Sequence, residues 1–275
     1  MKEQIKQLYR NNPKVSELIN SIDSNDNISC IGLSGSSRSY VVAAVSETLT
    51  NHNLVICSDK ESAAFFYNDL ENIFNEKDTD YSKKKVLFYP TSYKRPYEPE
   101  KPDNTYILSR TEVLQRISTG DRKTIIVTYP EALSEKVITR KVMTNNSFKM
   151  SIGNSISMDE LTDILVNFNF EHVDYVVEPG QFTIRGGIVD VFSFANDFPY
   201  RIEFFGDEVD SIRSFNPIDQ LSIEKVRNIV LIPNLQNQNN NFERESLLQY
   251  IKNQTIIWLD EEECLKDKVD EEFNK

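Results

Sequence analysis

Hydrophobic residues in the first half of the chain gather in short runs that alternate with longer amphipathic stretches. The short runs predict strands at residues 28–33, 53–58, 85–89 and 123–128. The amphipathic stretches predict helices at residues 41–50, 62–74 and 104–117. Strands that alternate with helices form a largely parallel sheet with helices on both faces. The pattern therefore predicts an α/β domain whose first part is residues 1–146.

The pattern changes after a polar stretch at residues 144–147. A helix is predicted at residues 158–168. Closely spaced strands follow it at residues 172–177, 181–185, 188–194, 200–205 and 208–215. Glycines lie between most of these strands, as the tight turns of an antiparallel sheet require. We therefore predict a second, α+β domain at residues 147–231, inserted into the first domain.

The last part of the chain, residues 232–275, is predicted to be a linker and a segment that returns to the first domain. Residues 235–244 are rich in asparagine and glutamine, which is typical of a linker. The apolar run at residues 255–259 predicts a final strand, and four acidic residues follow it.

The composition favours a cytoplasmic protein without a cofactor. No apolar run approaches the length of about 18 residues that a membrane span needs, and the N-terminus lacks the apolar centre of a secretory signal. The three cysteines, Cys30, Cys57 and Cys264, have no metal-ligand spacing. Cys30 and Cys57 lie in apolar runs and are predicted to be buried free thiols. His52 and His172 have no metal or triad partners in the sequence, so no catalytic or metal site is predicted.

The net charge of −12 argues against free DNA as the partner of this chain. It results from 43 acidic and 31 basic residues. A surface that neutralises DNA phosphates is normally basic. Protein partners remain compatible with an acidic chain.

Eight residues that begin at Gly32, GLSGSSRS, have the frame of a phosphate-binding loop without its central residues. A P-loop has the pattern G-x-x-x-x-G-K-[ST] between a strand and a helix. Gly32 and Ser39 match the two ends, and Gly35 lies between them. Ser37 replaces the second glycine and Arg38 replaces the lysine. A side chain at Ser37 occupies the space of a phosphate, and a planar guanidinium does not simply replace a compact ammonium. A strand–turn–helix corner is therefore favoured over a working nucleotide site.

Residues 176–215 resemble the second domain of the UvrB-homology module of the bacterial transcription-repair coupling factors, the Mfd family. Several elements occur in the same order as in that family. They are Gly180, Arg185–Gly186, an apolar run to Asp190, Pro199–Tyr200–Arg201, Phe204–Phe205 and the turn 207–211. The resemblance extends over nearly the whole chain, including the loop that begins at Gly32.

The resemblance implies a degenerate, helicase-like P-loop domain with an inserted domain that binds UvrA. In this family the N-terminal module has the fold of UvrB and a decayed nucleotide site, and Asp260–Glu261 resembles a decayed Walker B motif. The full-length protein is an ATP-dependent DNA translocase that binds RNA polymerase and DNA through other domains, so we expect this chain to be an N-terminal part of it. The implied function is a non-catalytic adaptor that recruits UvrA, and with it nucleotide excision repair, to stalled RNA polymerase.

Two other functions remain open. One is an ATP-dependent DNA-repair helicase subunit of the UvrB type, and Ser37 and Arg38 argue against it. The other is an autoinhibitory module whose UvrA surface is masked in the full-length protein. UvrB also has a DNA-clamping aromatic hairpin near the place of Tyr89, Tyr93 and Tyr97. The corresponding segment is short and rich in proline here, so we expect these tyrosines to pack structurally.

The strand at residues 200–205 presents the candidate partner surface. Side chains alternate between the two faces of a strand, so Tyr200, Ile202 and Phe204 are predicted to point into the core. Arg201, Glu203 and Phe205 then point outward. From the pattern alone, an ion pair between Arg201 and Glu203, with a loop that covers Phe205, remains an alternative.

The resemblance implies that Arg185, Arg201 and Phe205 contact UvrA, because the two arginines and the aromatic residue of the family's contact surface fall on these positions. We expect the three residues to form one exposed patch. We also expect their truncation to change stability little, because the side chains would face solvent.

Overall fold

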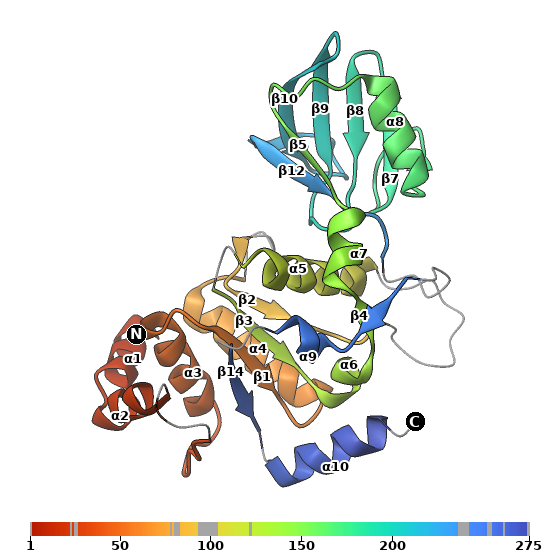
Figure 1. The fold of residues 1–275 in the computed structure, drawn as a ribbon. Helices are drawn as coiled ribbons and strands as arrows, with labels where there is room; N and C mark the ends of the chain where they lie inside the picture. Colours follow the sequence, from red (N-terminus) through yellow and green to blue (C-terminus); the bar gives the residue numbers. More distant parts are fainter. Residues whose placement is uncertain are drawn as a thin grey trace. The chain divides into compact units, whose positions relative to one another are not determined.

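The computed structural model describes residues 2–22, 24, 27–77, 79, 83–92, 104–120, 123–235, 242–251, 255–260 and 262–273. The chain divides into two compact units (Figure 1). Unit 1 contains residues 1–91, 119–135 and 247–275, and unit 2 contains residues 92–118 and 136–246. None of the helices in the described part of the chain is long and apolar enough to cross a membrane. The predicted domain boundaries themselves remain predictions.

A parallel sheet forms the centre of unit 1. The strands follow the order β14 (Thr255–Leu259), β1 (His52–Ile56), β3 (Ile125–Thr128) and β2 (Val86–Phe88). Every neighbouring pair in this sheet is parallel. Strands β1 and β3 are buried along their whole length, which explains why their sequences are continuous apolar runs rather than alternating ones. The predicted α/β fold class is confirmed.

The helices of unit 1 include two of the three that the amphipathic pattern predicted, those at residues 41–50 and 62–74. They are α3 (Ser37–Thr48) and α4 (Lys60–Phe74), together with the short α6 (Pro130–Ser134) and α9 (Leu247–Tyr250) and with α10 (Glu262–Phe273). Asp59 is the N-cap of helix α4, and its carboxylate accepts a hydrogen bond of 2.8 Å from the backbone N–H of Ser62. This bond lowers the pKa of Asp59, because it stabilises the ionised form at the helix N-terminus.

The sequence pattern did not predict two N-terminal helices. Helices α1 (Lys2–Arg10) and α2 (Pro13–Ile22) lie within the predicted first domain, before the first element that the pattern predicted. Val15 of α2 packs in a small core with Val41 and Ala44 of α3. Tyr9 stacks on Tyr40 with 5.1 Å between the ring centroids. These contacts make α1 and α2 part of unit 1.

The predicted strand at residues 28–33 is wrong. These residues form no strand, and Ile31 is 91% exposed. An apolar run becomes a strand only where another strand accepts its hydrogen bonds, and β14 is the last strand on its side of the sheet in the described part of the chain. Cys30 is therefore exposed, which contradicts its predicted burial. The prediction for Cys57 is confirmed, and burial raises the pKa of its thiol to about 12.

A six-stranded sheet forms the main part of unit 2. Its strands follow the order β11 (Ser222–Lys225), β10 (Glu208–Phe215), β9 (Tyr200–Phe205), β8 (Ile188–Val191), β7 (Gln181–Arg185) and β6 (Glu171–His172). All neighbouring pairs are antiparallel except β6 and β7. The predicted bounds of β7, β9 and β10 are confirmed, and β8 is shorter than predicted. The strand predicted at residues 172–177 is wrong except at His172, the last residue of β6.

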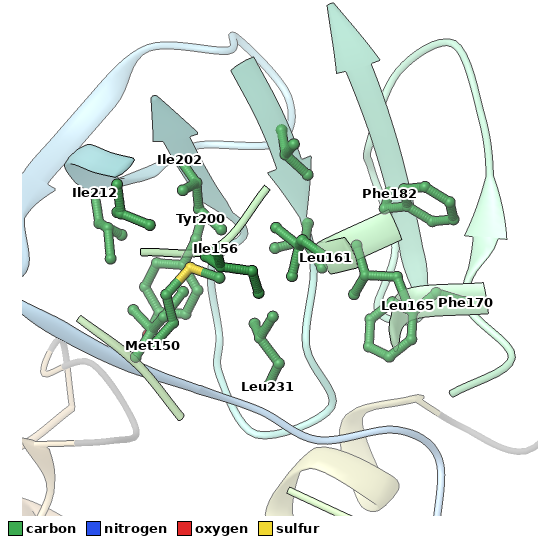
Figure 2. Packing of buried hydrophobic residues seen from close by; sticks show 14 residues of the cluster. Met150, Ile156, Leu161, Leu165, Phe170, Phe182, Tyr200, Ile202, Ile212 and Leu231 are labelled. Carbon is green, nitrogen blue, oxygen red and sulfur yellow. The ribbon is translucent and has the colours of Figure 1, made fainter. Parts of the chain in front are cut away.

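One face of this sheet packs into a hydrophobic core with helix α8 (Met158–Asn167) and the strand pair β5 (Phe148–Ser151) and β12 (Asn228–Leu231). Figure 2 shows Leu161 and Leu165 of α8 beside Phe182 of β7. Ile202 and Tyr200 of β9 belong to the same core. The opposite face of β7, β8 and β9 does not pack into this core, so other contacts must hold the side chains on it.

Unit 2 also contains helix α5 (Asn104–Thr119), helix α7 (Arg140–Asn145) and a short strand pair, β4 (Val137–Ile138) with β13 (Arg244–Glu245). The predicted helix at residues 104–117 is thus present. Thr139 caps α7, because its hydroxyl accepts a hydrogen bond from the backbone N–H of Val142.

We expect Gly180→Ala to lower the free energy of unfolding by about 2–5 kcal/mol. Gly180 has a left-handed φ of 88°, and a Cβ there would lie 2.7 Å from the ring of Phe194. Phe194 packs edge-on against Phe170 and has little room to move. Left-handed strain of about 1–2 kcal/mol therefore adds to overpacking of about 1–3 kcal/mol. Urea unfolding followed by circular dichroism measures the loss.

Gly206→Ala is the matched control for this prediction. Gly206 has a φ of 61°, but a Cβ there would meet nothing within 4 Å. This variant should lose only the strain of about 1–2 kcal/mol. Equal losses in the two variants would contradict the close contact between Gly180 and Phe194.

Candidate functional site

The outward face of strand β9 carries the predicted surface residues. Tyr200 and Ile202 lie in the hydrophobic core, and Phe204 packs against it. Arg201, Glu203 and Phe205 alternate with them and therefore lie on the opposite face. The face assignment predicted from the strand period is confirmed.

Asp190 lies at the centre of this outward face. It is on β8, directly opposite Arg201 of β9, and its carboxylate is fully buried. It accepts hydrogen bonds from Nε of Arg201 at 2.7 Å and from Nη2 of Arg201 at 2.8 Å. It also forms an ion pair with Nη2 of Arg185 on β7. Two guanidinium groups therefore offset the cost of burying one carboxylate.

Arg201 is more enclosed than the sequence predicted. Its side chain is only 16% exposed, its guanidinium lies 4.5 Å from the ring centroid of Phe215, and Nη2 also donates to Oε1 of Gln220 at 3.3 Å. Its hydrogen bonds to Asp190 raise the pKa of the guanidinium. The expectation that its side chain faces solvent is therefore wrong, because its hydrogen bonds to Asp190 hold it against the sheet.

The alternative pairing of Arg201 with Glu203 is also wrong. Glu203 instead forms an ion pair with Arg213 of β10 and accepts a hydrogen bond from the hydroxyl of Ser211. Arg213 lies opposite Arg201 in the ladder between β9 and β10. Each arginine of this pair thus has its own carboxylate.

Arg185 and Phe205 are the accessible members of the predicted patch. The side chain of Arg185 is 43% exposed, and its guanidinium lies 5.6 Å from the ring centroid of Tyr175. Phe205 is 83% exposed, so no loop covers it. It lies four residues along β9 from Arg201, a distance of about 13 Å at ~3.3 Å per residue. The structure brings the two arginines together through Asp190 and leaves Phe205 at the end of the strand.

Sequence reasoning missed Asp190 and Gln220 as parts of this surface. In the sequence, Asp190 marks only the end of an apolar run. It alternates with the buried Val189 and Val191, so the strand period places it on the outward face, where a carboxylate beside arginines is a signal for an ion pair. Gln220 has no such signal, because it follows β10 in a loop and reaches Arg201 only through the fold.

We refer to Arg185, Asp190, Arg201 and Phe205 as the β9 surface. It combines two cations, one buried anion and an exposed aromatic ring. The guanidinium groups keep further N–H donors for a partner's carboxylates, since each has five donors. The arrangement is suited to a protein partner that is acidic beside an apolar site, and it offers no nucleophile or general base.

The loop that resembles a P-loop forms hydrogen bonds within itself. Gly32 and Gly35 have positive φ values of 85° and 54°. The hydroxyl of Ser37 accepts a hydrogen bond of 2.9 Å from the backbone N–H of Ser34 and donates one of 2.7 Å to its carbonyl. The backbone N–H groups of Ser37 and Arg38 donate to carbonyls of the same loop. Three N–H groups of the loop therefore have internal acceptors.

The side chains of the last two residues of this loop also have protein partners. Arg38 forms an ion pair with Asp260, which directly follows β14. Ser39 is buried, and its hydroxyl donates to Oδ2 of Asp69 at 3.4 Å. Glu261, the other residue of the Walker B resemblance, lies outside the described residues.

Of the three tyrosines considered for base stacking, Tyr89 is fully buried. Its backbone N–H donates to the carbonyl of Val127, which extends the ladder between β2 and β3. Its predicted structural packing is confirmed. Tyr93 and Tyr97 lie outside the described residues. In the part of the chain that the structure describes, no group of His, Cys, Asp or Glu residues could hold a metal ion.

Comparison with known proteins identifies a family domain within unit 2. The model of the family described as the UvrB interaction domain matches residues 148–236. This part of the chain is a UvrB interaction domain. It contains the six-stranded sheet, helix α8 and the whole β9 surface.

The similarity to individual proteins extends beyond the UvrB interaction domain. The chain is 32% identical over 202 residues to the transcription-repair-coupling factor of Bacillus subtilis, with 74% of this chain and 16% of the relative covered. It is 28% identical over 218 residues to that of Myxococcus xanthus, with 79% of this chain and 18% of the relative covered. It is 27% identical over 219 residues to the UvrABC system protein B of Thermosipho africanus, with 74% and 31% covered. The resemblance to transcription-repair-coupling factors and UvrB is therefore confirmed.

The chain spans only part of these relatives. It covers 16–18% of the length of the two coupling factors and 31% of the UvrABC system protein B. Activities and partners of the whole relatives are accordingly proposals for this chain.

We expect Arg201→Ala to destabilise the UvrB interaction domain by about 3 kcal/mol. The variant leaves the buried Asp190 with Arg185 as its remaining ion-pair partner, and removal of one partner from a buried ion pair costs about 3–5 kcal/mol. The matched control is Arg213→Ala, because Arg213 and Glu203 are each 31% exposed and exposed pairs contribute less than about 1 kcal/mol. Thermal and urea unfolding measure both variants. A loss for Arg201→Ala no greater than that for Arg213→Ala would refute the structural role of the buried pair.

Proposed function

We propose that the UvrB interaction domain of this chain binds UvrA through the β9 surface. The observation that carries the proposal is the pair of arginines held by one buried carboxylate, with Phe205 exposed on the same sheet face. The match of residues 148–236 to the UvrB interaction domain supports it. So does the resemblance to coupling factors, in which two arginines and an aromatic residue contact UvrA.

The chemistry of the surface suits a stable protein contact. Arginine and aromatic residues are enriched at the energetic centres of interfaces. The guanidinium groups would donate charge-assisted hydrogen bonds to carboxylates of UvrA. Phe205 would supply an apolar anchor, since a phenylalanine buries a large area when it enters a pocket.

The chain would then act as a non-catalytic adaptor. It would recruit UvrA, and with it nucleotide excision repair, to stalled RNA polymerase. In this proposal, contacts with RNA polymerase and DNA belong to other parts of a full-length coupling factor, and the protein works in the cytoplasm. The name that its relatives carry, transcription-repair-coupling factor, supports this placement.

A second candidate function is that of an ATP-dependent helicase subunit of the UvrB type. The similarity to UvrABC system protein B favours it. The internal hydrogen bonds of the loop at Ser37 and the ion pair between Arg38 and Asp260 favour the adaptor instead. A phosphate would have to compete with these bonds for the donors that a P-loop directs at its ligand.

We expect Phe205→Ala and Arg185→Ala to weaken UvrA binding by about 1–4 kcal/mol each, as truncation at an interface centre does. Because Phe205 is 83% exposed, Phe205→Ala should change the free energy of unfolding by less than about 0.5 kcal/mol. Arg185→Ala should lose more than this, because it removes one of the two ion-pair partners of the buried Asp190. Arg201→Lys tests the third position, since it keeps the charge and loses the planar fork that Asp190 binds. Isothermal titration calorimetry with purified UvrA measures the affinities.

Phe65→Ala is the matched control for Phe205→Ala, because Phe65 of α4 is also exposed, at 73%, and lies in unit 1. This variant should bind UvrA like the unchanged chain. If the Phe205 and Arg185 variants both bind like Phe65→Ala, the β9 surface is not the UvrA site.

We expect no heat of binding when ATP and magnesium are titrated into the chain. Ser37 and Arg38 stand where a P-loop has glycine and lysine. Ser37 is hydrogen-bonded to Ser34 within the loop, and Arg38 forms an ion pair with Asp260. The same calorimeter cell can test Arg38→Ala. Micromolar ATP affinity that Arg38→Ala abolishes would favour the helicase-type function.

A further inference from the structure

Asp190 is part of the β9 surface but would not itself contact UvrA. It lies on β8, between the two strands that carry the arginines of the β9 surface. Its side chain is fully buried, so a partner protein cannot reach it. Both of its oxygens nevertheless have arginine partners: Oδ1 accepts from Arg201, and Oδ2 accepts from both Arg201 and Arg185.

This geometry fixes Arg201 in one orientation. Nε and Nη2 form a two-point contact with the carboxylate, and the Phe215 ring supports the guanidinium. Gln220 accepts a further bond from Nη2 and donates to the carbonyls of Pro217 and Val176. A free arginine side chain samples many rotamers, and binding must then restrict them. Here the restriction is already present in the unbound chain.

The carboxylate also brings two like charges together. Without an anion between them, the guanidinium groups of Arg185 and Arg201 would repel each other. With Asp190 between them, the two cations and one anion carry a net charge of +1. The cluster can therefore present two arginines at one place on the sheet.

We propose that Asp190 is the positioning residue of the β9 surface, which orders Arg185 and Arg201 for a carboxylate-bearing partner. The proposal rests on the proposed UvrA function for its affinity test. The alternative is that Asp190 weakens partner binding, because its carboxylate competes with the partner's carboxylates for the same N–H donors. The two effects predict opposite changes in affinity when the charge of Asp190 is removed.

The first experiment measures UvrA affinity for Asp190→Asn, which keeps the shape of the side chain and removes its charge. We expect the affinity to fall by about tenfold or more, the size of effect that loss of a supporting partner has at metal sites. Unchanged or tighter binding by the folded variant would overturn the proposal. Glu203→Gln is the matched control, because it removes the carboxylate of the neighbouring ion pair with Arg213 and leaves Asp190 intact. It should keep most of the affinity.

A double-mutant cycle separates positioning from a general structural role. If Asp190 acts through the arginines, Asp190→Asn should weaken binding less in an Arg185→Ala background than in the unchanged chain. A purely structural effect would be the same in both backgrounds. Additive losses would therefore count against the proposal.

A third measurement needs neither UvrA nor a folded variant. In the unchanged chain, the Nε–H group of Arg201 should exchange slowly with water and be as rigid as the backbone in NMR relaxation. The side chain of Arg10, which is 47% exposed and forms an ion pair of 3.6 Å with Glu47, supplies the reference for an arginine at the surface. If Arg201 is as mobile as Arg10, positioning by Asp190 is refuted. If Arg201 is rigid but the chain does not bind UvrA, the proposed function fails while the ordering of the arginines stands.

Discussion

A carboxylate that is buried in a sheet requires cations close by, and this requirement organises the outward face of the UvrB interaction domain. Asp190 needs Arg201 and Arg185, so β7 and β9 must flank β8 with these residues in reach. The guanidinium of Arg201 in turn lies over the ring of Phe215, 4.5 Å from its centroid. Around Phe215, a small second core forms with Val176 and Phe192. The positions of the side chains on the face opposite the main core therefore depend on the buried carboxylate of Asp190.

Strands with a clear period and glycine turns could be predicted from the sequence. The bounds of β7, β9, β10 and β14 follow from their runs and from the turns around them. The alternation in β9 also predicted which side chains enter the core. These properties are local, because the strand period and turn chemistry are set by neighbouring residues.

The rest depends on partners that lie far away in the sequence. The run at residues 28–33 has the composition of a strand but no neighbouring strand to bond with in the described part of the chain. The enclosure of Arg201 depends on Asp190, 11 residues earlier, and on Gln220, 19 residues later. Neither contact follows from the strand period, because the period determines the face of a side chain and not its partner. The β9 surface was thus predictable as a set of outward residues, whereas its internal order was not.

The pairing of β1 with β14 has a consequence for the order in which the chain folds during synthesis. Trp258 beside β1 donates a hydrogen bond to Asn53, and the two residues are 205 positions apart. At roughly 5–20 residues per second, a ribosome takes roughly 10–40 s to produce the residues between them. Throughout that interval one edge of β1 lacks its neighbour, while all the strands of the UvrB interaction domain emerge in an unbroken stretch. The domain that carries the β9 surface can therefore finish its sheet on the ribosome before the sheet of unit 1, which started earlier, is complete.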